Sequence, residues 1–191
     1  MTDKTLLVFS GPSGAGKTTL IRYVLHMFKD QIGITISCTT RSSRDREVDG
    51  IDYHFITQEK FSTLVKKEEF LEHTECYGNR YGTLKRSVNE LLQDKGVCIM
   101  DVDYIGAASI LSGNFEPQLK KVGVLILPPS ISSLKKRLIG RKSEAPESLE
   151  TRLKKSFDSP KIATYDHILI NDTLENSKAI ILQIVKPYLL V

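Results

Sequence analysis

The sequence lacks the features that mark exported, membrane-spanning and disulfide-stabilised proteins. Its 191 residues contain no tryptophan and only three cysteines, none in a CxxC pair: Cys38, Cys76 and Cys98. An odd number of separated cysteines predicts free thiols in a reducing compartment rather than a disulfide framework or a zinc site. No apolar run approaches the ~20 residues of a membrane span, and the N-terminal apolar stretch is too short for a signal peptide. We therefore expect a cytoplasmic protein with no membrane contact.

A strong charge of either sign is also missing. The 27 basic and 23 acidic residues leave a net charge of +4. No dense run of Lys and Arg with interleaved aromatic residues is present, so nucleic-acid binding is not expected. The small basic excess indicates either a mixed, solvated surface or arginines that bind the phosphate groups of a small substrate. The motifs along the chain favour the second interpretation.

Short apolar runs predict strands that are buried on both faces of a parallel sheet. They lie at residues 5–10 (TLLVFS), 97–100 (VCIM), 122–127 (VGVLIL) and 167–170 (HILI). Helical spacing of apolar residues predicts helices at 17–28, 87–93, 131–139, about 147–155 and 174–185. Alternating strands and helices indicate an α/β fold with a doubly wound parallel sheet flanked by helices.

Two regions break this alternation. Residues 37–83 are richer in Thr, Tyr, Phe, Arg and Asp, with strand-like pieces (YHFI, EFLEH) around a short helix (EKFSTLVKK). We expect them to form a small α+β insertion on a core of residues 1–36 and 84–191. The charged stretch GRKSEAPE joins two predicted helices, and we expect a lid at about 140–152.

The segment GPSGAGKT matches the phosphate-binding pattern G-x-x-x-x-G-K-[ST] in full. Its glycines let the backbone curl so that successive N–H groups point at phosphate oxygens, and the following helix adds its positive dipole end. Lys17 would reach the β- and γ-phosphates, and Thr18 would offer its hydroxyl to Mg²⁺. The context predicts a P-loop NTPase-type sheet whose ATP-binding residues are Gly11, Pro12, Ser13, Gly14, Ala15, Gly16, Lys17, Thr18 and Thr19.

The chain lacks the further motifs of a GTPase or an ATPase motor. It has no NKxD guanine-reading sequence, and it is short for a motor. Asp101 and Asp103 do follow a predicted strand, where Asp101 would hold Mg²⁺ directly or through water. The alternative is that both aspartates simply end the strand.

Arginines gather in the irregular regions: Arg41, Arg44, Arg137, Arg141 and Arg152. Guanidinium groups neutralise the charge on a phosphoryl group during its transfer through bidentate, charge-assisted hydrogen bonds. Any single one of these arginines could instead be a solvated surface residue. An acceptor that is itself a phosphate needs no general base, because its oxygen is already ionised, so catalysis rests on alignment and electrostatic stabilisation. We accordingly expect structural roles for His26, His54, His73 and His167.

Several segments in order resemble the guanylate kinase family over essentially the whole chain. They are GPSGAGKTT, SCTTRSSRDREVDGIDYHFI, EFLEH, YGNRYGT, CIMDVDYIGA, ILPPSISSLKKRLIGR and ILINDTL. The resemblance implies conversion of ATP and GMP to ADP and GDP with Mg²⁺, with dGMP as a second acceptor. It also implies a sheet core, a GMP-binding insertion and a lid. The sequence leaves open whether the chain is a monomer or a homodimer.

The resemblance also implies roles for single residues. The GMP phosphate would be held by Arg41, Arg44, Tyr53 and Tyr81. The guanine would be read by Ser37, Glu72, Thr83 and Asp103. When the lid closes, the catalytic set around the transferring phosphates would be Lys17, Arg44, Arg137, Arg141 and Arg152. Asn171 would lie near the ATP adenine.

The chemistry of guanine agrees with these roles. Guanine presents N1–H and N2–H₂ as neighbouring donors, from which Glu72 would accept, and Thr83 would donate to O6. Adenine presents a bare N1 acceptor, so the carboxylate would stay unpaired, and a buried unsatisfied charge gives discrimination of roughly 10⁴-fold. Without the resemblance, Glu72 would be interpreted as a solvent-facing strand residue.

The chain departs from the family pattern in three places. After TTR, the usual x-P-R-x-G-E reads SSRDRE, with Ser43 for proline and Arg46 for glycine, so we expect a less rigid loop. Tyr104 and Ile105 precede Gly106 where the family has a glutamine, and GRKSEAPE stands in a lid of usual GRGT type. None of these changes removes a residue with a named chemical role.

Two other functions remain open on the sequence. Guanylate-kinase-like modules of scaffold proteins bind phosphopeptides without catalysis, but they typically lose the P-loop residues that this chain keeps. The second is a kinase for another acceptor, either a ribose phosphate, against which the full base-reading set argues, or another nucleoside monophosphate, which an assay with AMP, UMP, CMP and dGMP would separate.

Overall fold

The computed structural model describes residues 4–45, 47–76, 78–113, 119–139 and 165–189. Its centre is a five-stranded, parallel sheet with the order β2-β7-β1-β8-β9. The strands are β1 (Thr5–Ser10), β2 (Ile32–Ile34), β7 (Val97–Asp101), β8 (Lys120–Leu127) and β9 (His167–Ile170). All four strands predicted from apolar runs are present, and the α/β fold class is confirmed.

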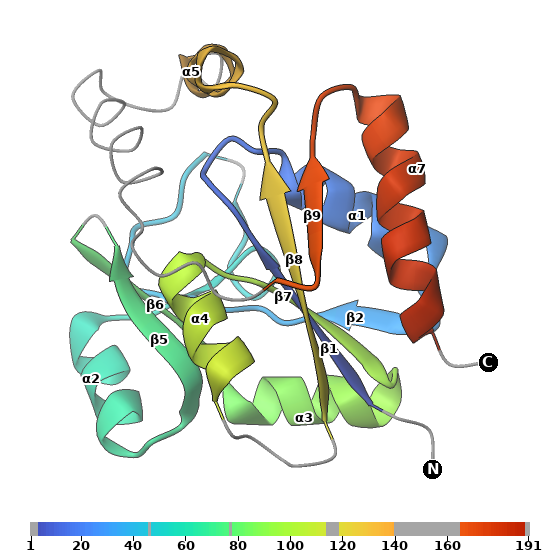
Figure 1. Ribbon diagram of the computed structural model, residues 1–191. Coiled ribbons are helices and arrows are strands. Elements are labelled where there is room, and N and C mark those ends of the chain that lie inside the picture. Colours follow the sequence, from blue (N-terminus) through green and yellow to red (C-terminus); the bar gives the residue numbers. More distant parts are fainter. Residues whose placement is uncertain (1–3, 46, 77, 114–118, 140–164, 190–191) are drawn as a thin grey trace.

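Helices cover both faces of this sheet (Figure 1). One face is covered by α1 (Lys17–Met27) and α7 (Leu174–Val185), and the other by α3 (Lys85–Asp94) and α4 (Tyr104–Ser112). Alternate residues of β1 point to opposite faces, so Leu7 and Phe9 pack with α1 and α7 while Leu6 and Val8 pack with α3 and α4. Each of these side chains is fully buried, which contributes about 1.5–3 kcal/mol apiece. β1 therefore lies in both cores and fixes the start of the loop that follows it.

A second sheet with the order β4-β3-β6-β5 lies beside the first. Its strands are β3 (Cys38–Thr39), β4 (His54–Phe55), β5 (Phe70–Cys76) and β6 (Asn79–Leu84), and α2 (Gln58–Lys66) packs on it. Cys38, Phe61, Phe70 and Leu84 form a separate apolar core, with the rings of Phe61 and Phe70 stacked 4.5 Å apart. The region of mixed composition thus folds as an α+β unit with its own core.

Besides β3 and β6, strand β2 and helix α4 have no counterpart among the predicted elements. Strand β2 has only three residues and contains Gly33, too little for a recognisable pattern. Helix α4 reads YIGAASILS, in which apolar residues surround most of the helix rather than forming one stripe. Its start signal is Asp103, whose carboxylate accepts from the Gly106 amide at 2.8 Å as the N-cap. Helix α5 (Ile131–Ile139) has the predicted bounds, whereas the predicted helix at 147–155 and the lid at 140–152 lie outside the described residues.

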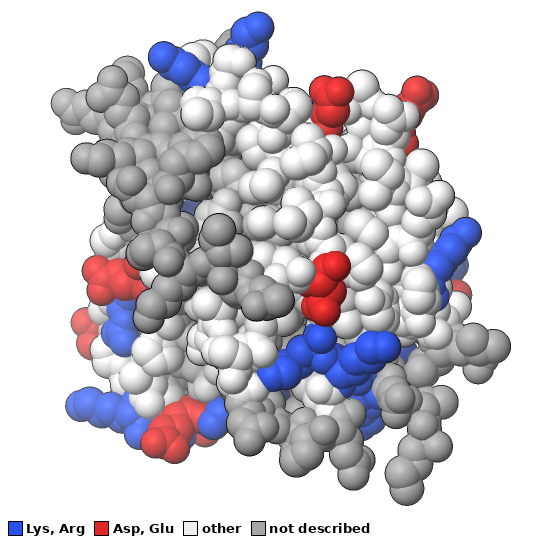
Figure 2. Space-filling model, viewed as in Figure 1, with Lys and Arg blue, Asp and Glu red and all other residues white. Residues whose placement is uncertain are grey.

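The edge strand β9 leaves apolar side chains exposed. Ile168 and Ile170 are 62% and 50% exposed, and Figure 2 shows few charged atoms over β8, β9 and α7. The C-terminal 3-10 helix η1 (Lys186–Tyr188) returns to this strand, where His167 Nε2 and Tyr188 Oη share a 2.8 Å hydrogen bond. Tyr188 and Leu189 pack against the core of α1 and α7. None of the helices within the described ranges has the length and apolar character needed to span a bilayer.

Candidate active site

The glycine-rich loop of residues 11–16 connects the carboxyl end of β1 to α1. Gly11, Gly14 and Gly16 have φ angles of 139°, 87° and 95°, a region that only glycine adopts readily. A Cβ on Gly11 would also collide with the Ile126 carbonyl, and one on Gly16 would collide with the Asn171 amide. Both the conformation and the space require glycine, in agreement with the phosphate-binding pattern.

Lys17 begins α1 and folds back over this loop. Its Nζ donates to the Gly11 carbonyl at 2.8 Å and to the Pro12 carbonyl at 3.4 Å, and it lies 3.9 Å from Asp101 Oδ1. Burial raises the pKa of the Asp101 carboxyl, and the Lys17 ammonium offsets part of that rise. Thr18 follows in the first turn of α1. The start of α1 thus supplies an ammonium and a hydroxyl, from Lys17 and Thr18, and the end of β7 supplies the carboxyl of Asp101.

Arg137 and Asn171 brace the same loop. The Asn171 Nδ2 donates to the Ala15 carbonyl at 2.6 Å. The Arg137 guanidinium donates to the carbonyls of Ala15 at 3.4 Å, Asn171 at 2.8 Å and Asp172 at 3.3 Å. These contacts join the loop, α5 and the β9–α7 connection. The family resemblance implies positions near ATP for both residues, but it carries no signal for this bracing of the backbone.

Three of the predicted base-reading residues form a hydrogen-bonded chain on the second sheet. Thr83 Oγ1 donates to Glu72 Oε1 at 2.9 Å, so the Ser37 hydroxyl, 3.0 Å from Thr83 Oγ1, is left to donate to Thr83. Glu72 is only 6% exposed. Desolvation raises the pKa of its carboxyl to about 7 against the lowering effect of the Thr83 hydrogen bond, and Asp103 adds to the rise. This carboxyl therefore changes charge near neutral pH in the free protein.

Asp103 is the fourth predicted base-reading residue, and it follows strand β7 of the first sheet. One oxygen of its carboxylate caps α4, and the other accepts from the Thr74 hydroxyl at 3.0 Å. Thr74 was missed by the sequence reasoning. The available signal was its position two residues after Glu72 in a strand, which puts both side chains on one face. The Asp103–Thr74 hydrogen bond links the two sheets at the site.

The predicted ligands of the acceptor phosphate gather around Arg41. Its guanidinium lies 5.3 Å from the centroid of the Tyr53 ring, and the Tyr53 and Tyr81 rings meet edge to face at 6.1 Å. Burial raises the pKa of Tyr53 to about 12, so its hydroxyl stays protonated and can donate. Glu47, a second residue without a predicted role, binds Arg41 through both oxygens and accepts from the Arg44 amide. Its signal was the glutamate that ends the family loop pattern.

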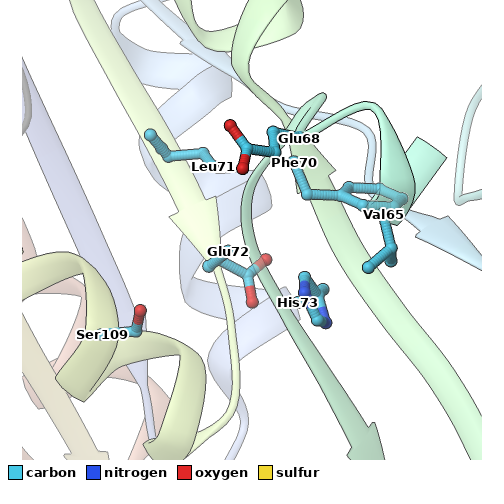
Figure 3. A pocket seen from close by; sticks show the side chains of 7 residues that line it. All are labelled: Val65, Glu68, Phe70, Leu71, Glu72, His73 and Ser109. Carbon is cyan, nitrogen blue, oxygen red and sulfur yellow. The ribbon is translucent and has the colours of Figure 1, made fainter.

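A cavity of about 260 Å³ reaches Glu72 from the side of α2 and α4 (Figure 3). It is lined by Val65, Glu68, Phe70, Leu71, Glu72, His73 and Ser109. Figure 3 shows Glu72 on β5 and Ser109 on α4 at this cavity. A space of this size holds several water molecules, which gives the buried carboxyl a route for proton exchange.

The structure does not describe all of the predicted site residues. Arg141 and Arg152, and also Arg46 of the acceptor loop, lie outside the described residues. Among the residues that are described, no three His, Cys, Asp or Glu side chains form a metal-binding group. Thr18 and Asp101 nevertheless offer the hard oxygen atoms that suit Mg²⁺, an ion usually held by one or two carboxylates together with substrate phosphates. Cys38, Cys76 and Cys98 all lie within the described ranges and form no disulfide.

Comparisons with known proteins agree with this geometry. A family model described as guanylate kinase matches residues 3–188. A guanylate kinase of Clostridium perfringens (strain 13 / Type A) is 43% identical over 173 residues, covering 90% of this chain and 78% of that protein. A guanylate kinase of Bacteroides thetaiotaomicron is 37% identical over 191 residues, covering 99% and 91%. The crystal structure of guanylate kinase from Anaplasma phagocytophilum superposes with a TM-score of 0.74 at 26% identity, covering 98% of this chain and 87% of that one.

Proposed function

Because the chain belongs to the guanylate kinase family, we propose how its own residues perform that family's reaction, the transfer of a phosphoryl group from ATP to GMP. The chain is an enzyme of this kinase type. The observation that supports the residue roles is the pairing of a lysine-bearing glycine loop with a buried Glu72–Thr83–Ser37 chain. The loop suits a triphosphate, and the chain suits a purine with neighbouring N–H donors.

On the ATP side, the backbone N–H groups of residues 11–19 bind the phosphates. Lys17 exchanges its two carbonyl partners for phosphate oxygens, and Asn171 lies on the adenine side. Thr18 and Asp101 would hold Mg²⁺, which would neutralise charge on the phosphate oxygens. Positive charge at the phosphoryl group in transfer comes from Arg137, Arg141 and Arg152.

On the GMP side, Glu72 accepts hydrogen bonds from guanine N1–H and N2–H₂. These donors replace the Thr83 hydroxyl, which is then free to donate to guanine O6. Asp103 is a second acceptor for the 2-amino group, and Ser37 supports Thr83. The phosphate of GMP is held by Arg41, Arg44, Tyr53 and Tyr81.

The transfer itself needs no general base, since the attacking oxygen of GMP is already ionised. The arginines and tyrosines hold that oxygen in line with the γ-phosphate, which removes most of the entropic barrier. Lys17 and Arg44 stabilise the charge that develops on the transferred group.

The remaining parts of the proposal concern the whole chain. Residues 37–83 form the GMP-binding insertion, residues 1–36 and 84–191 form the core, and about 140–152 form the lid. We include dGMP as a second acceptor, because none of the proposed base contacts involves the ribose 2′-hydroxyl. The enzyme acts in the cytoplasm as a monomer or homodimer, with Mg²⁺ and ATP.

A coupled assay of ADP formation tests this assignment. ATP with GMP should give rapid turnover, dGMP should be accepted, and AMP, UMP and CMP should be poor. The Lys17→Ala variant serves as the blank, with its fold checked by circular dichroism. Binding of GMP without ADP formation would indicate a non-catalytic module, and equal rates with AMP would contradict the roles of Glu72 and Asp103.

A further inference from the structure

We propose that Glu47 is a positioning residue for the acceptor phosphate. Glu47 holds Arg41 and the backbone of Arg44 in the arrangement that binds this phosphate. The proposal rests on the proposed function, because it requires an acceptor that carries a phosphate at these arginines. Nothing in the reaction needs Glu47 to touch the substrate.

One carboxylate joins the two arginines. Glu47 Oε2 accepts from Arg41 Nη1 at 2.8 Å and from the Arg44 amide at 2.8 Å, while Oε1 accepts from Arg41 Nη2 at 3.0 Å. The Glu47 amide donates in return to the Arg44 carbonyl at 3.0 Å. Burial alone would raise the pKa of Glu47, but the hydrogen bonds from Arg41 and Arg44 hold it below its usual range. The side chain therefore stays charged at neutral pH.

The pair is shielded from solvent. The Arg41 and Glu47 side chains are only 14% and 19% exposed, so solvent and salt screen their attraction less than at an open surface. The Arg41 guanidinium also lies 5.3 Å and 5.6 Å from the ring centroids of Tyr53 and Phe55. With a carboxylate on one edge and aromatic rings beside it, the guanidinium has one preferred orientation before any ligand arrives.

The donor count leaves room for a phosphate. A guanidinium has five N–H groups. Glu47 takes one from each of Nη1 and Nη2, and the Ser42 carbonyl takes a second from Nη1 at 2.7 Å. The other two N–H groups are left for Tyr81, which also interacts with Arg41, and for an incoming phosphate. Glu47 thus fixes the edge of Arg41 that faces the acceptor.

The same contacts also allow the opposite interpretation, in which Glu47 hinders phosphate binding. An experiment distinguishes the two interpretations. A carboxylate bound by two arginines can act as a stand-in for the substrate phosphate and compete with it. Removing Glu47 would then strengthen GMP binding. If Glu47 positions the arginines, removing it weakens GMP binding instead, because Arg41 loses its orientation and Arg44 loses its backbone acceptor.

Isothermal titration with GMP, guanosine and ATP tests the proposal on Glu47→Gln and Glu47→Asp. We expect Glu47→Gln to weaken GMP binding roughly tenfold or more and to raise the KM for GMP by a similar factor. Guanosine binding should be unchanged, because guanosine has no phosphate, and it also reports that the base pocket is folded. Glu69→Gln, an exposed glutamate of the same region, controls for the change in net charge and should behave like the wild type.

An Arg41→Ala background tests whether Glu47 acts on GMP binding through Arg41. There, adding Glu47→Gln should weaken GMP binding much less than it does in the wild type, because its main partner is already gone. Tighter GMP binding by Glu47→Gln, equal losses for GMP and guanosine, or the full loss in the Arg41→Ala background would each overturn the proposal. Wild-type binding of GMP no tighter than guanosine would overturn both this proposal and the assignment of the phosphate ligands, whereas normal wild-type turnover with a silent Glu47→Gln would overturn this proposal alone.

Discussion

A residue that suits ligand binding can destabilise the folded protein, and Glu72 is the clearest case at this site. Its carboxyl is 6% exposed and its pKa is raised from 4.5 to about 7 by desolvation. In the unfolded chain it ionises near its usual value, so the folded state binds more protons between these two pH values. The free energy of unfolding therefore falls as pH rises from about 4.5 to 7. At about 1.4 kcal/mol per pH unit, the full penalty above pH 7 is roughly 3 kcal/mol.

Glu72→Gln should consequently raise the melting temperature of the free enzyme at pH 8 while it weakens GMP binding. The amide still accepts from Thr83, but it presents a donor where guanine has N–H groups. We expect GMP binding to fall by roughly 10²-fold or more and ATP binding to stay within about twofold. Calorimetric melting and titration with both nucleotides measure this. A lower melting temperature, or equal losses for GMP and ATP, would count against a buried base-reading carboxylate.

Glu72 also predicts a pH dependence for base recognition. Below pH 7 the protonated carboxyl presents O–H to guanine N–H, so affinity should fall about tenfold per pH unit from pH 7 towards pH 5. Guanosine is the suitable ligand, because the phosphate of GMP itself titrates near pH 6. Glu72→Gln provides the control and should bind guanosine with a flat pH profile. A flat profile in the wild type would show that guanosine binding does not depend on the charge of this carboxyl.

Among the elements, the β9–α7 connection supports the phosphate-binding loop from outside. Asn171 is buried and its amide donates to the Ala15 carbonyl at 2.6 Å. Asn171→Ala leaves that carbonyl with the longer Arg137 contact of 3.4 Å alone, a loss of roughly 1–3 kcal/mol. We expect the KM for ATP to rise about tenfold with the KM for GMP nearly unchanged. Steady-state kinetics test this against Asp172→Ala, a neighbouring exposed side chain; equal effects of the two variants would contradict the bracing.

The elements also indicate how far the sequence alone carries. Continuous apolar runs identified four strands of the parallel sheet, and the glycine pattern identified the loop, because both signals are local. Strand β2 and helix α4 escaped, since three residues or a helix that is apolar on most sides give no periodic pattern. The base-reading residues came from the family resemblance. Thr74 and Glu47 were missed although each had a local signal, whereas the Asn171–Ala15 bond had none, because a long-range contact to a backbone carbonyl depends on how the elements pack.

At the scale of the whole molecule, two polar contacts link the second sheet to the rest of the structure. The Arg22–Asp52 pair links α1 to the predicted insertion at 3.3 Å, but the Arg22 side chain is 72% exposed, and such pairs contribute about 0–1 kcal/mol. The Asp103–Thr74 hydrogen bond is a second link. Apolar packing adds to these contacts, because Leu71 of β5 packs against the core formed with α3 and α4.

We expect the proposed insertion and lid to close over the two nucleotides, because both substrates must be enclosed for the transfer. A bisubstrate analogue should reduce the radius of gyration measured by small-angle X-ray scattering, with ATP or GMP alone giving smaller changes. Arg22→Ala should retain the full reduction, since the pair is exposed. Identical scattering curves with and without the analogue would contradict closure.

The β5–β6 hairpin has a consequence for how base specificity can change. Glu72 pairs with Thr83, and Thr74 pairs with Tyr81, so one antiparallel register lines up the groups for the base and for the phosphate. A shift of β6 by one residue would turn both Tyr81 and Thr83 to the other face of the sheet. Loss or gain of a residue near Gly78 would therefore disable both halves of acceptor binding at once. A change of acceptor by exchange of single side chains leaves this register intact, whereas a change in hairpin length does not.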